Sequence, residues 1–375
     1  MTKVKYLIIG SGVTGLSFAN FIDSEDYLIL EKESSPGGYC KTVYQDGFVW
    51  DYSGHFFHFR DSKIEDYLLE RMSEDEDILK VNKITKIHYK DDYIDFPFQK
   101  NIHQLSKDDL IDCLHGLFTR TTKEEYENFE QMLFGKFGKG ITEKFLKPYN
   151  EKLYACDLSK LDVEAMGRFF PYADPNEIIK GFKSDASGND SYNSTFTYPT
   201  KGAIQYINAL LKDLNQNKII YNSAVENINL DEKYVISKGK KIYFDKLISS
   251  IPFNKVLDLM NEEKLVSLSS NKVLVFNLGF NKKGQDNIHW CYYPENEFCF
   301  YRIGYYDNIA NTDRMSLYVE IGLKSDCKVD VEEYKSQVLR DLKKTKVILD
   351  HELISSHSIV LNPAYVHITK ESNSF

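Results

Sequence analysis

The segment from residue 4 to residue 30 constrains the fold of this chain more than any other part of the sequence. Residues 4–9 (VKYLII) are a mostly apolar run, which is typical of a strand buried on both faces of a parallel sheet. Residues 13–21 then show the apolar spacing of a helix, and residues 27–30 (YLIL) are a second apolar run that ends at the acidic Glu31. The sequence therefore predicts a strand, a helix and a second strand within about 30 residues, the first unit of a Rossmann-like α/β fold.

Three glycines stand between the first strand and the helix, with the spacing Gly10-x-Gly12-x-x-Gly15. In this pattern the first glycine permits a sharp turn, the second lets the backbone reach a pyrophosphate, and the third lets helix and strand pack closely. Val13 and Thr14 open the helix, whose N-terminus faces the anion. Because the motif follows a buried strand and precedes a helix, it predicts a dinucleotide site at these residues.

The continuation EKESSPGG decides which dinucleotide we expect. Glu31, followed by Lys32, can accept hydrogen bonds from the adenosine ribose and would repel the extra phosphate of NADP, and the pair Gly37-Gly38 lets the backbone approach a ligand where a Cβ would collide. This combination resembles the FAD-binding segment shared by flavin amine oxidases, protoporphyrinogen oxidase and UDP-galactopyranose mutase. The resemblance implies FAD as the cofactor. It also implies that Val225, in NSAVENI, offers its backbone to the adenine, with a plain core valine as the alternative.

Four later stretches resemble UDP-galactopyranose mutase within this superfamily and keep its order. YSGHFFHF is similar to the mutase H-x-F-H loop, and FCFYRIGYY to the strand whose arginine lies near the flavin and the sugar diphosphate. FLKPYNEKLYACDLSKL resembles the helix segment K-G-Y-x-x-K-Q-W-G, and FTYPTKGAIQYI resembles the P-x-G-G-Y turn before a helix. The resemblance implies the following site residues: Arg302 and His58 as catalytic residues, Tyr154, Tyr198, Lys201 and Tyr301 as substrate-binding residues, and His55 and His58 as flavin-binding residues.

The resemblance implies a mutase that interconverts the pyranose and furanose rings of a nucleotide-sugar for polysaccharide biosynthesis. In that reaction N5 of reduced FAD attacks the anomeric carbon and UDP leaves, and Arg302 would hold the leaving diphosphate through a bidentate contact. Two other functions stay open: a FAD-dependent oxidoreductase of the amine oxidase or protoporphyrinogen oxidase type, and a degenerate FAD- or nucleotide-binding protein without turnover. At the residue level, Arg302 could instead pair with a carboxylate, and His55 and His58 could be buried core histidines.

Several positions depart from the mutase pattern, mostly on the substrate side. Ser194 lies near the place of a second diphosphate arginine, for which Lys201 can supply a point charge but no planar fork. Tyr154 replaces the family's tryptophan, and Ile321 replaces the tyrosine that follows a strand glutamate. The superfamily also closes its FAD fold near the C-terminus with a strand, a Gly-Arg or Gly-Asp turn and a helix. We expect that element to be absent here, because the sequence ends at YVHITKESNSF.

The pattern of elements predicts a Rossmann-like FAD-binding domain with a helical insertion and a substrate domain built on an antiparallel sheet. We expect the FAD-binding domain at residues 1–60 and 200–260, a mostly helical insertion at 61–199, and a strand-rich substrate domain at 261–375. Apolar and polar residues alternate over residues 83–98, which predicts a β-hairpin there. The polar stretch DASGNDSYNS (185–194) is a candidate loop or lid.

The composition and charge of the chain limit the classes of binding partner that we expect. A net charge of −9 and a pI near 5.6 disfavour a nucleic-acid partner, which usually meets a basic surface. The six cysteines form no CxxC pair and have no histidine at zinc spacing, so we expect reduced thiols and no metal. No segment approaches about 18 consecutive apolar residues, so no membrane span is expected. These features predict a cytoplasmic protein that acts on a small-molecule substrate, and a homodimer is a candidate assembly.

Overall fold

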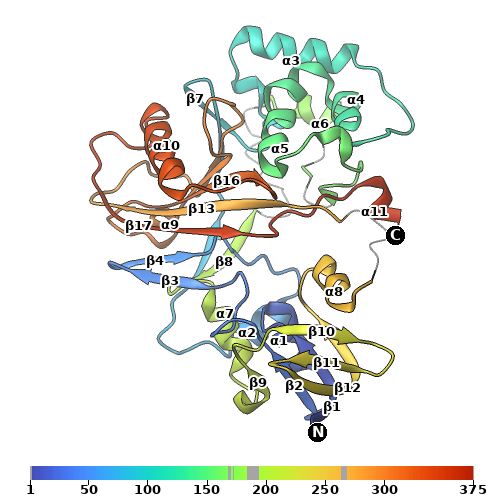
Figure 1. Cartoon of the computed structure of the whole chain (residues 1–375). Helices are drawn as coiled ribbons and strands as arrows, with labels where there is room; N and C mark the ends of the chain where they lie inside the picture. Colours follow the sequence, from blue (N-terminus) through green and yellow to red (C-terminus); the bar gives the residue numbers. More distant parts are fainter. Residues whose placement is uncertain (1, 168–169, 172, 184–193, 263–267, 375) are drawn as a thin grey trace. The chain divides into compact units, whose positions relative to one another are not determined.

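The computed structural model describes residues 2–167, 170–171, 173–183, 194–262 and 268–374. Contacts between Cα atoms divide the chain into two compact units (Figure 1). Unit 1 comprises Met1–Lys80 and Phe196–Leu265, and unit 2 comprises Val81–Thr195 and Val266–Phe375. Each unit is therefore built from two separate segments of the chain.

Unit 1 contains a six-stranded sheet with β1 near its centre. In spatial order the strands are β10 (Val225–Asn229), β11 (Tyr234–Ser237), β12 (Lys240–Ser249), β1 (Thr2–Ile9), β2 (Tyr27–Leu30) and β9 (Ile219–Ile220). β1 runs parallel to both neighbours, β2 and β12, while β10 and β11 add an antiparallel edge. This is the mixed sheet of a Rossmann-like α/β fold, and the predicted fold class is confirmed.

Helices cover both faces of this sheet, which explains why the second half of β1, residues 6–9, is apolar. The helices are α1 (Val13–Phe21), α2 (Ser62–Leu69), α7 (Ile204–Leu211) and α8 (Phe253–Met260). Ile8 packs in a core with residues of α1 and α7, whereas Leu7 and Ile9 pack in a second core with Val256 of α8. Because these three side chains of β1 alternate between two cores, none of the three can be polar. A hairpin of β3 (Thr42–Gln45) and β4 (Phe48–Asp51) also belongs to this unit.

Unit 2 is built on a seven-stranded sheet. In spatial order the strands are β17 (Leu353–Leu361), β13 (Asn271–Phe280), β16 (Ser316–Lys324), β15 (Arg302–Tyr305), β14 (Trp290–Tyr292), β6 (Thr85–Tyr89) and β7 (Asp92–Asp95). All neighbours pair antiparallel except β14 and β6, which are parallel. The β6–β7 hairpin lies within the predicted range 83–98. β5 (Ile78–Asn82) and β8 (Thr195–Pro199) form a separate two-stranded sheet.

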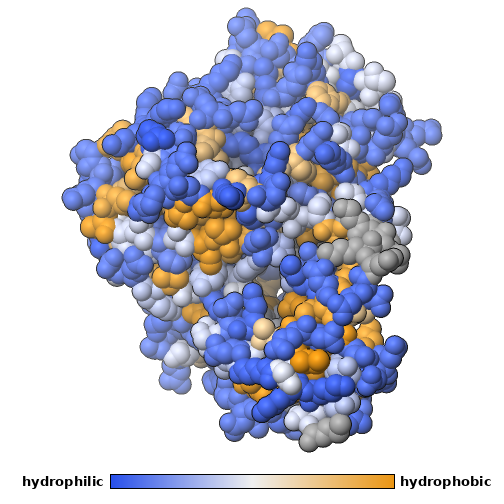
Figure 2. Space-filling view, in the orientation of Figure 1, coloured by the Kyte–Doolittle hydropathy of each residue, from blue (hydrophilic) through white to orange (hydrophobic). Residues whose placement is uncertain are grey.

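The two faces of the seven-stranded sheet differ in chemistry. On one face Cys291, Ile303 and Val319 belong to a core that also contains Val338 and Leu342 of α10 (Val331–Lys344). On the other face Tyr292, Arg302 and Glu320 lie side by side in register across three strands. At the β17 edge, Figure 2 shows a patch of apolar side chains over the β13–β17 region, and Ile354 and Val360 of β17 are exposed. One face thus holds the core and the other carries polar and aromatic groups.

The remaining helices of unit 2 are mostly clustered between β7 and β8 in the chain. They are α3 (Lys107–Thr119), α4 (Phe129–Ile141), the π-helix η3 (Thr142–Leu146), α5 (Lys147–Tyr154), α6 (Pro175–Lys180), α9 (Tyr306–Ala310) and α11 (Lys370–Ser374). Short 3-10 helices are η1 (Phe98–Lys100), η2 (Ile102–Gln104) and η4 (Leu158–Lys160) here, and η6 (Gln216–Lys218) in unit 1. Over the described ranges, no helix is both long and apolar enough to cross a membrane.

The grouping of these helices differs from the three segments expected from the sequence. Residues 61–199 contain strands β5 to β8 as well as helices, and the helices belong to the same compact unit as the strands after residue 270. The physical reason is close packing of α5 on the sheet. A Cβ at Gly322 of β16 would lie 2.0 Å from the carbonyl oxygen of Lys152 in α5, so helix and strand are in backbone contact. The candidate lid at 185–194 falls outside the described residues except for Ser194.

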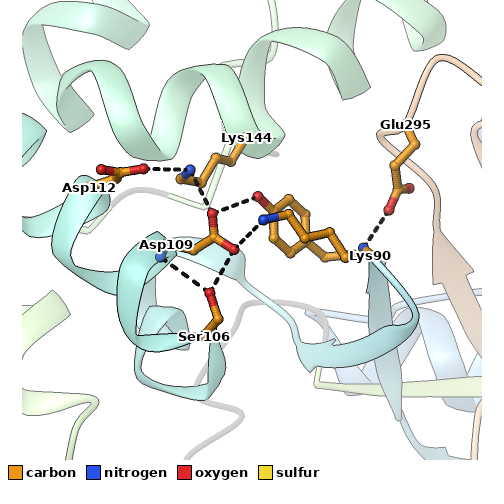
Figure 3. Close-up of polar contacts among 7 residues, drawn as sticks. Lys90, Ser106, Asp109, Asp112, Lys144 and Glu295 are labelled. Carbon is orange, nitrogen blue, oxygen red and sulfur yellow. Dashed lines mark hydrogen bonds and ion pairs between the residues drawn. The ribbon is translucent and has the colours of Figure 1, made fainter.

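A buried carboxylate joins the β6–β7 hairpin to the helices (Figure 3). Asp109 in the first turn of α3 accepts hydrogen bonds from Lys144 Nζ of η3 at 2.8 Å, from Lys90 Nζ of the hairpin turn at 2.6 Å and from Ser106 Oγ at 2.9 Å. Burial raises the pKa of Asp109, but these hydrogen bonds outweigh burial and leave the pKa well below its usual range. The carboxylate is therefore ionised and ties three segments of unit 2 together.

Candidate functional site

The glycine turn after β1 contains two glycines that the fold requires, Gly10 and Gly15, and one that it does not require, Gly12. Gly10 has φ +98°, a left-handed conformation that favours glycine, and a Cβ at Gly15 would lie 2.1 Å from the carbonyl oxygen of Gly10. Both are required by the protein itself. A Cβ at Gly12, the N-cap of α1, would meet nothing closer than the Cα of Gly38 at 3.9 Å. The fold does not require glycine at position 12, so the space there is open to a ligand at the helix N-terminus.

A second glycine turn lies against the first. Gly37 and Gly38 have φ +120° and +57°, and the N–H of Gly37 donates to the carbonyl oxygen of Ser11 at 2.9 Å. A Cβ at Gly38 would lie 3.5 Å from the Cα of Gly12. Two stretches of backbone without side chains thus face each other at the N-terminus of α1, which is the cradle that the phosphates of FAD need. The residues present fit that cofactor.

Glu31 lies at the end of β2 beside this cradle and is 6% exposed. Its Oε2 accepts hydrogen bonds from Ser11 N at 2.8 Å and Ser11 Oγ at 2.7 Å, and its Oε1 accepts from Glu33 N at 2.9 Å. These contacts orient the carboxylate next to the glycine turn, where the ribose ligand was expected. Ser11 is a contributor that the glycine pattern did not single out, although its hydroxyl stands inside the motif G-S-G.

The other predicted cofactor residues have less specific surroundings. Val13 packs against the core of unit 1, and Thr14, next to it in α1, is exposed. Lys32 points to solvent, with a side chain that is 72% exposed and 3.4 Å from Glu33. Val225 begins the edge strand β10 and packs partly against a core, which is the plain structural role raised as its alternative.

His55 and His58 lie in the histidine loop, which we define as residues 52–58, between β4 and α2. His55 Nδ1 is 3.0 Å from the carbonyl oxygen of Ser53, and the ring of His58 makes an edge contact with Phe196 of β8 at 6.1 Å. Both histidines are half-buried. The loop is held to β8 by two backbone hydrogen bonds between Phe57 and Thr197. A contact of His55 or His58 with a flavin stays a prediction.

Tyr198 and Lys201 have partners within unit 1. The hydroxyl of Tyr198 is buried and donates to Asp51 Oδ2 at 2.9 Å, and Lys201 Nζ lies 2.7 Å from Asp75 Oδ2. Glu76 lies 3.8 Å from the same ammonium. The charge of Lys201 is therefore already balanced by carboxylates, which weakens it as a substitute for the missing diphosphate arginine.

Arg302 is paired with a carboxylate, as the alternative reading of the sequence allowed. Its Nε lies 2.6 Å from Glu320 Oε2 and its Nη2 2.8 Å from Glu320 Oε1, so the pair is bidentate. Glu320 is 1% exposed, whereas 20% of the Arg302 side chain is exposed. A ligand at this face would meet the outer side of an ion pair and not an isolated cation.

Tyrosine rings surround this ion pair. The Arg302 guanidinium lies 5.9 Å from the ring centre of Tyr301 and 5.8 Å from that of Tyr318, and the ring of Tyr149 in α5 lies 6.2 Å from Tyr301. Burial raises the pKa of Tyr301 well above its usual value, with a further rise from the charge of Glu320. These phenols are therefore neutral, and they form a polar but uncharged surround.

Tyr154 lies at the end of α5 and faces the interior of unit 2. Its hydroxyl donates to the carbonyl oxygen of Ala165 at 3.2 Å, and its own carbonyl oxygen is 2.9 Å from His367 Nε2. A role in substrate binding stays a prediction for this residue. Among the residues that the structure describes, no group of three histidines, cysteines or carboxylates could hold a metal ion.

A cavity of about 850 Å³ lies elsewhere, among the helices of unit 2. None of the predicted site residues lines it. Its lining includes Asp112, Arg120, Tyr126, Glu130, Lys139 and Lys144. Because none of the predicted site residues lines this cavity, we do not assign the expected chemistry to it.

Asp51 is the buried charged residue of unit 1 that the sequence patterns missed. It is 0% exposed and accepts hydrogen bonds from Thr42 Oγ1 at 2.6 Å, Tyr198 OH at 2.9 Å and Ala203 N at 3.0 Å. A carboxylate inside the aromatic run FVWDYSG was the available signal, because a charge among core residues needs partners.

Comparisons with known proteins agree with this geometry. A family described as an NAD(P)-binding Rossmann-like domain matches residues 8–70. Coproporphyrinogen III oxidase from Staphylococcus aureus (strain NCTC 8325 / PS 47) is 22% identical over 331 residues, which span 77% of this chain and 70% of that protein. Among solved structures, reduced UDP-galactopyranose mutase matches with a TM-score of 0.91 and 22% identity, over 99% of this chain and 86% of the mutase chain.

A second solved structure, from Exiguobacterium sp. 255-15 and described as a protoporphyrinogen oxidase, matches with a TM-score of 0.76 and 16% identity, over 98% of this chain and 88% of that chain. At these identities the likeness concerns the fold, because one fold hosts several chemistries. The predicted fold class is confirmed, and the proteins that share this fold include members of the expected superfamily. FAD as the cofactor of this chain is part of the proposed function. This chain therefore shares its fold with UDP-galactopyranose mutase and the protoporphyrinogen oxidase, and residues 8–70 match a Rossmann-like family.

Proposed function

We propose that this chain is a FAD-dependent sugar-nucleotide mutase that interconverts pyranose and furanose rings. The observation that carries the proposal is the bidentate Arg302–Glu320 pair among tyrosines, on the polar face of a sheet in a chain whose fold matches a mutase over 99% of its length. An uncharged, aromatic surround suits a sugar, and a fixed guanidinium suits a leaving diphosphate. Polysaccharide biosynthesis, a cytoplasmic location and a homodimer belong to the same proposal.

The roles of the residues follow from their contacts. When bound and reduced, FAD would supply the nucleophile that displaces a nucleoside diphosphate from the anomeric carbon of the sugar. Gly12 and Gly38 would leave room for the pyrophosphate of the cofactor. Glu31, which Ser11 orients, would accept hydrogen bonds from the ribose. Glu320 holds the guanidinium of Arg302 in one plane, so that its outer edge can attract the leaving diphosphate. His58 would orient the flavin.

A specific observation also favours a second candidate, an oxidoreductase. The matching protein from S. aureus is named an oxidase, and neither Lys201 nor Ser194 supplies the second cation that a diphosphate would favour. An oxidase needs a flavin and an apolar or aromatic substrate surround, and the tyrosines around Arg302 provide such a surround as well. The two candidates differ in what they require of the flavin, which makes them separable.

The deciding experiment measures turnover with oxidised and with reduced protein. A panel of UDP- and dTDP-sugars is incubated with each form, and ring isomers are separated by chromatography. We expect isomerisation only after reduction with dithionite, because the proposed nucleophile is N5 of reduced flavin and oxidised flavin lacks it. Oxygen consumption by the oxidised protein with a porphyrinogen or an amine would instead establish the oxidase. A stoichiometric flavin without either activity would point to a binding protein without turnover.

The variant Arg302→Lys links the activity to this site. Lysine keeps a charge beside buried Glu320, so the variant is expected to fold and keep its flavin, but it lacks the planar fork. Turnover should fall by about tenfold or more, the effect of losing one charge-assisted hydrogen bond. Unchanged turnover would remove Arg302 from the mechanism.

A further inference from the structure

The Asp51 cluster, which we define as Thr42, Asp51, Tyr198 and Ala203, joins three separate segments of unit 1. Thr42 belongs to β3, Tyr198 to β8, and Ala203 precedes α7. Asp51 itself ends β4, and the histidine loop follows it directly. Each of the three other members donates a hydrogen bond to the one carboxylate.

The loop before α7 is shaped around this carboxylate. Gly202 has φ +91°, and a Cβ there would lie 3.0 Å from Asp51 Oδ1 and 2.4 Å from Thr42 Cγ2. Ile204 N, at the start of α7, donates to Thr42 Oγ1 at 3.1 Å. Asp51 and Thr42 together therefore satisfy two of the N–H groups that a helix start leaves unpaired, so they cap α7 from another part of the chain.

Helix α7 in turn contacts the Gly37-Gly38 turn of the candidate cofactor cradle and the far end of α1, the helix whose N-terminus forms the other part. A Cβ at Gly37 would lie 3.2 Å from Ile204 Cδ1, so the second glycine turn rests on the first residue of α7. Farther along, Asn20 Nδ2 of α1 donates to the carbonyl oxygen of Leu210 at 2.7 Å. The position of α7 thus sets the position of the Gly37-Gly38 turn and supports α1.

The histidine loop rests on the same helix. Phe57 stacks on Tyr206 of α7, with ring centres 3.7 Å apart, and Phe56 packs on Tyr198 at 5.2 Å. The loop that carries His55 and His58 is therefore held at one end by Asp51 and along its length by elements that Asp51 also holds.

We propose that Asp51 is a positioning residue of the cofactor site, which holds the histidine loop and the Gly37-Gly38 turn in fixed places through α7. The inference rests on the proposed binding of FAD. It assigns Asp51 no contact with the cofactor. The burial of an ionisable group at this joint is a cost to stability that a purely structural contact between apolar residues would avoid.

The test compares Asp51→Ala with Asp51→Asn and with a matched control, Asp307→Ala. Asparagine keeps an oxygen toward Thr42 and Ala203 and turns an amide toward the Tyr198 hydroxyl, which can accept. Asp307 in unit 2 is also buried, accepts from Ser316 N at 3.1 Å, and shares with Asp51 a pKa raised to about 6 by burial. Truncating it removes a comparable carboxylate away from the Asp51 cluster.

Flavin affinity and the flavin absorption spectrum are measured at a temperature where every variant is folded. Asp51→Ala is expected to raise the Kd for FAD about tenfold and to shift the flavin absorption band. A tenfold rise corresponds to the loss of about one contact between FAD and the turn that Asp51 positions. Asp51→Asn should restore both, and Asp307→Ala should lower only the Tm. An Asp51→Ala variant with the Kd and spectrum of the parent protein would overturn the inference.

Hydrogen exchange separates this outcome from a failure of the proposed function. If the parent protein binds no FAD, the proposed function fails, and the inference is judged without the cofactor. Asp51→Ala is then expected to speed amide exchange in residues 52–58 and 203–206, while Asp307→Ala leaves both segments unchanged. Equal exchange in the two variants would show that Asp51 holds neither segment.

Discussion

At the scale of single residues, the three glycines of the Gly10-x-Gly12-x-x-Gly15 motif are not equivalent. Gly10 and Gly15 are needed by the fold, because φ is +98° at the first and a Cβ at the second would lie 2.1 Å from a carbonyl oxygen. Gly12 has an ordinary φ of −79° and open space around it. The fold could accept a side chain at Gly12 that a ligand in the cradle could not.

Gly12→Ala is therefore expected to separate binding from folding. Its Tm, measured without flavin, should stay close to that of the flavin-free parent protein, while FAD content falls, because the methyl group occupies the place of the pyrophosphate. Flavin absorbance per protein and the thermal midpoint measure the two effects. Gly15→Ala is the control and should lose both. Full flavin content in Gly12→Ala would contradict the assignment of the pyrophosphate site.

At the scale of secondary-structure elements, polar joints set how the helices of unit 2 meet the sheet. Asp109 connects α3 to η3 through Lys144 and to the hairpin turn through Lys90. Its pKa is lower in the folded chain than its ordinary value, so the ionised form is favoured by folding. The stability it contributes is complete above the pKa of an unfolded aspartate and is lost as the pH falls toward the lower folded pKa.

Asp109→Asn should cost about 2 kcal/mol of unfolding free energy at neutral pH, since charge-assisted hydrogen bonds to two lysines are weakened. Asp108→Asn, at the exposed neighbouring position of α3, should change stability by only about 0.5 kcal/mol. Urea unfolding measured at pH 7 and again below pH 4 checks both values. The difference between Asp109→Asn and the parent protein should shrink at the lower pH, and a constant difference would exclude the proposed ionisation.

At the scale of the whole molecule, each unit combines distant parts of the chain. β1 pairs with β12, more than two hundred residues later, and the sheet of unit 2 combines β6 and β7 with strands after residue 270. Neither sheet can form until both of its chain segments are present. A ligand that binds the folded glycine cradle should therefore stabilise an assembly of distant segments.

FAD at about 100 times its Kd is expected to add about 2.7 kcal/mol to the unfolding free energy. A rise of the thermal midpoint with increasing FAD concentration measures this effect. NAD and NADP at the same concentrations serve as controls and should give smaller shifts, because the Gly37-Gly38 turn was assigned to FAD. A larger shift with NAD would reverse that assignment, although the matching family is described as NAD(P)-binding.

Local patterns predicted the cofactor half of the site. Gly10 and Gly12 lie within one strand–helix–strand unit, and Glu31 and the Gly37-Gly38 pair follow it directly, so short-range spacing was enough to predict them together. The hairpin at 85–95 followed from alternation for the same reason. Such features depend on backbone geometry over a few residues, which the sequence encodes directly.

The partners of the charged residues were decided only by the tertiary structure. Arg302 and Glu320 were both visible in the sequence, but their pairing depends on the register between β15 and β16. Lys201 forms an ion pair with Asp75, and Asp51 accepts hydrogen bonds from Thr42, Tyr198 and Ala203. No local sequence pattern connects the segments that carry these partners. The sequence by itself determined the Rossmann-like unit and its glycine cradle, whereas long-range packing determined which charges are paired, because pairing depends on where distant strands and helices come to lie.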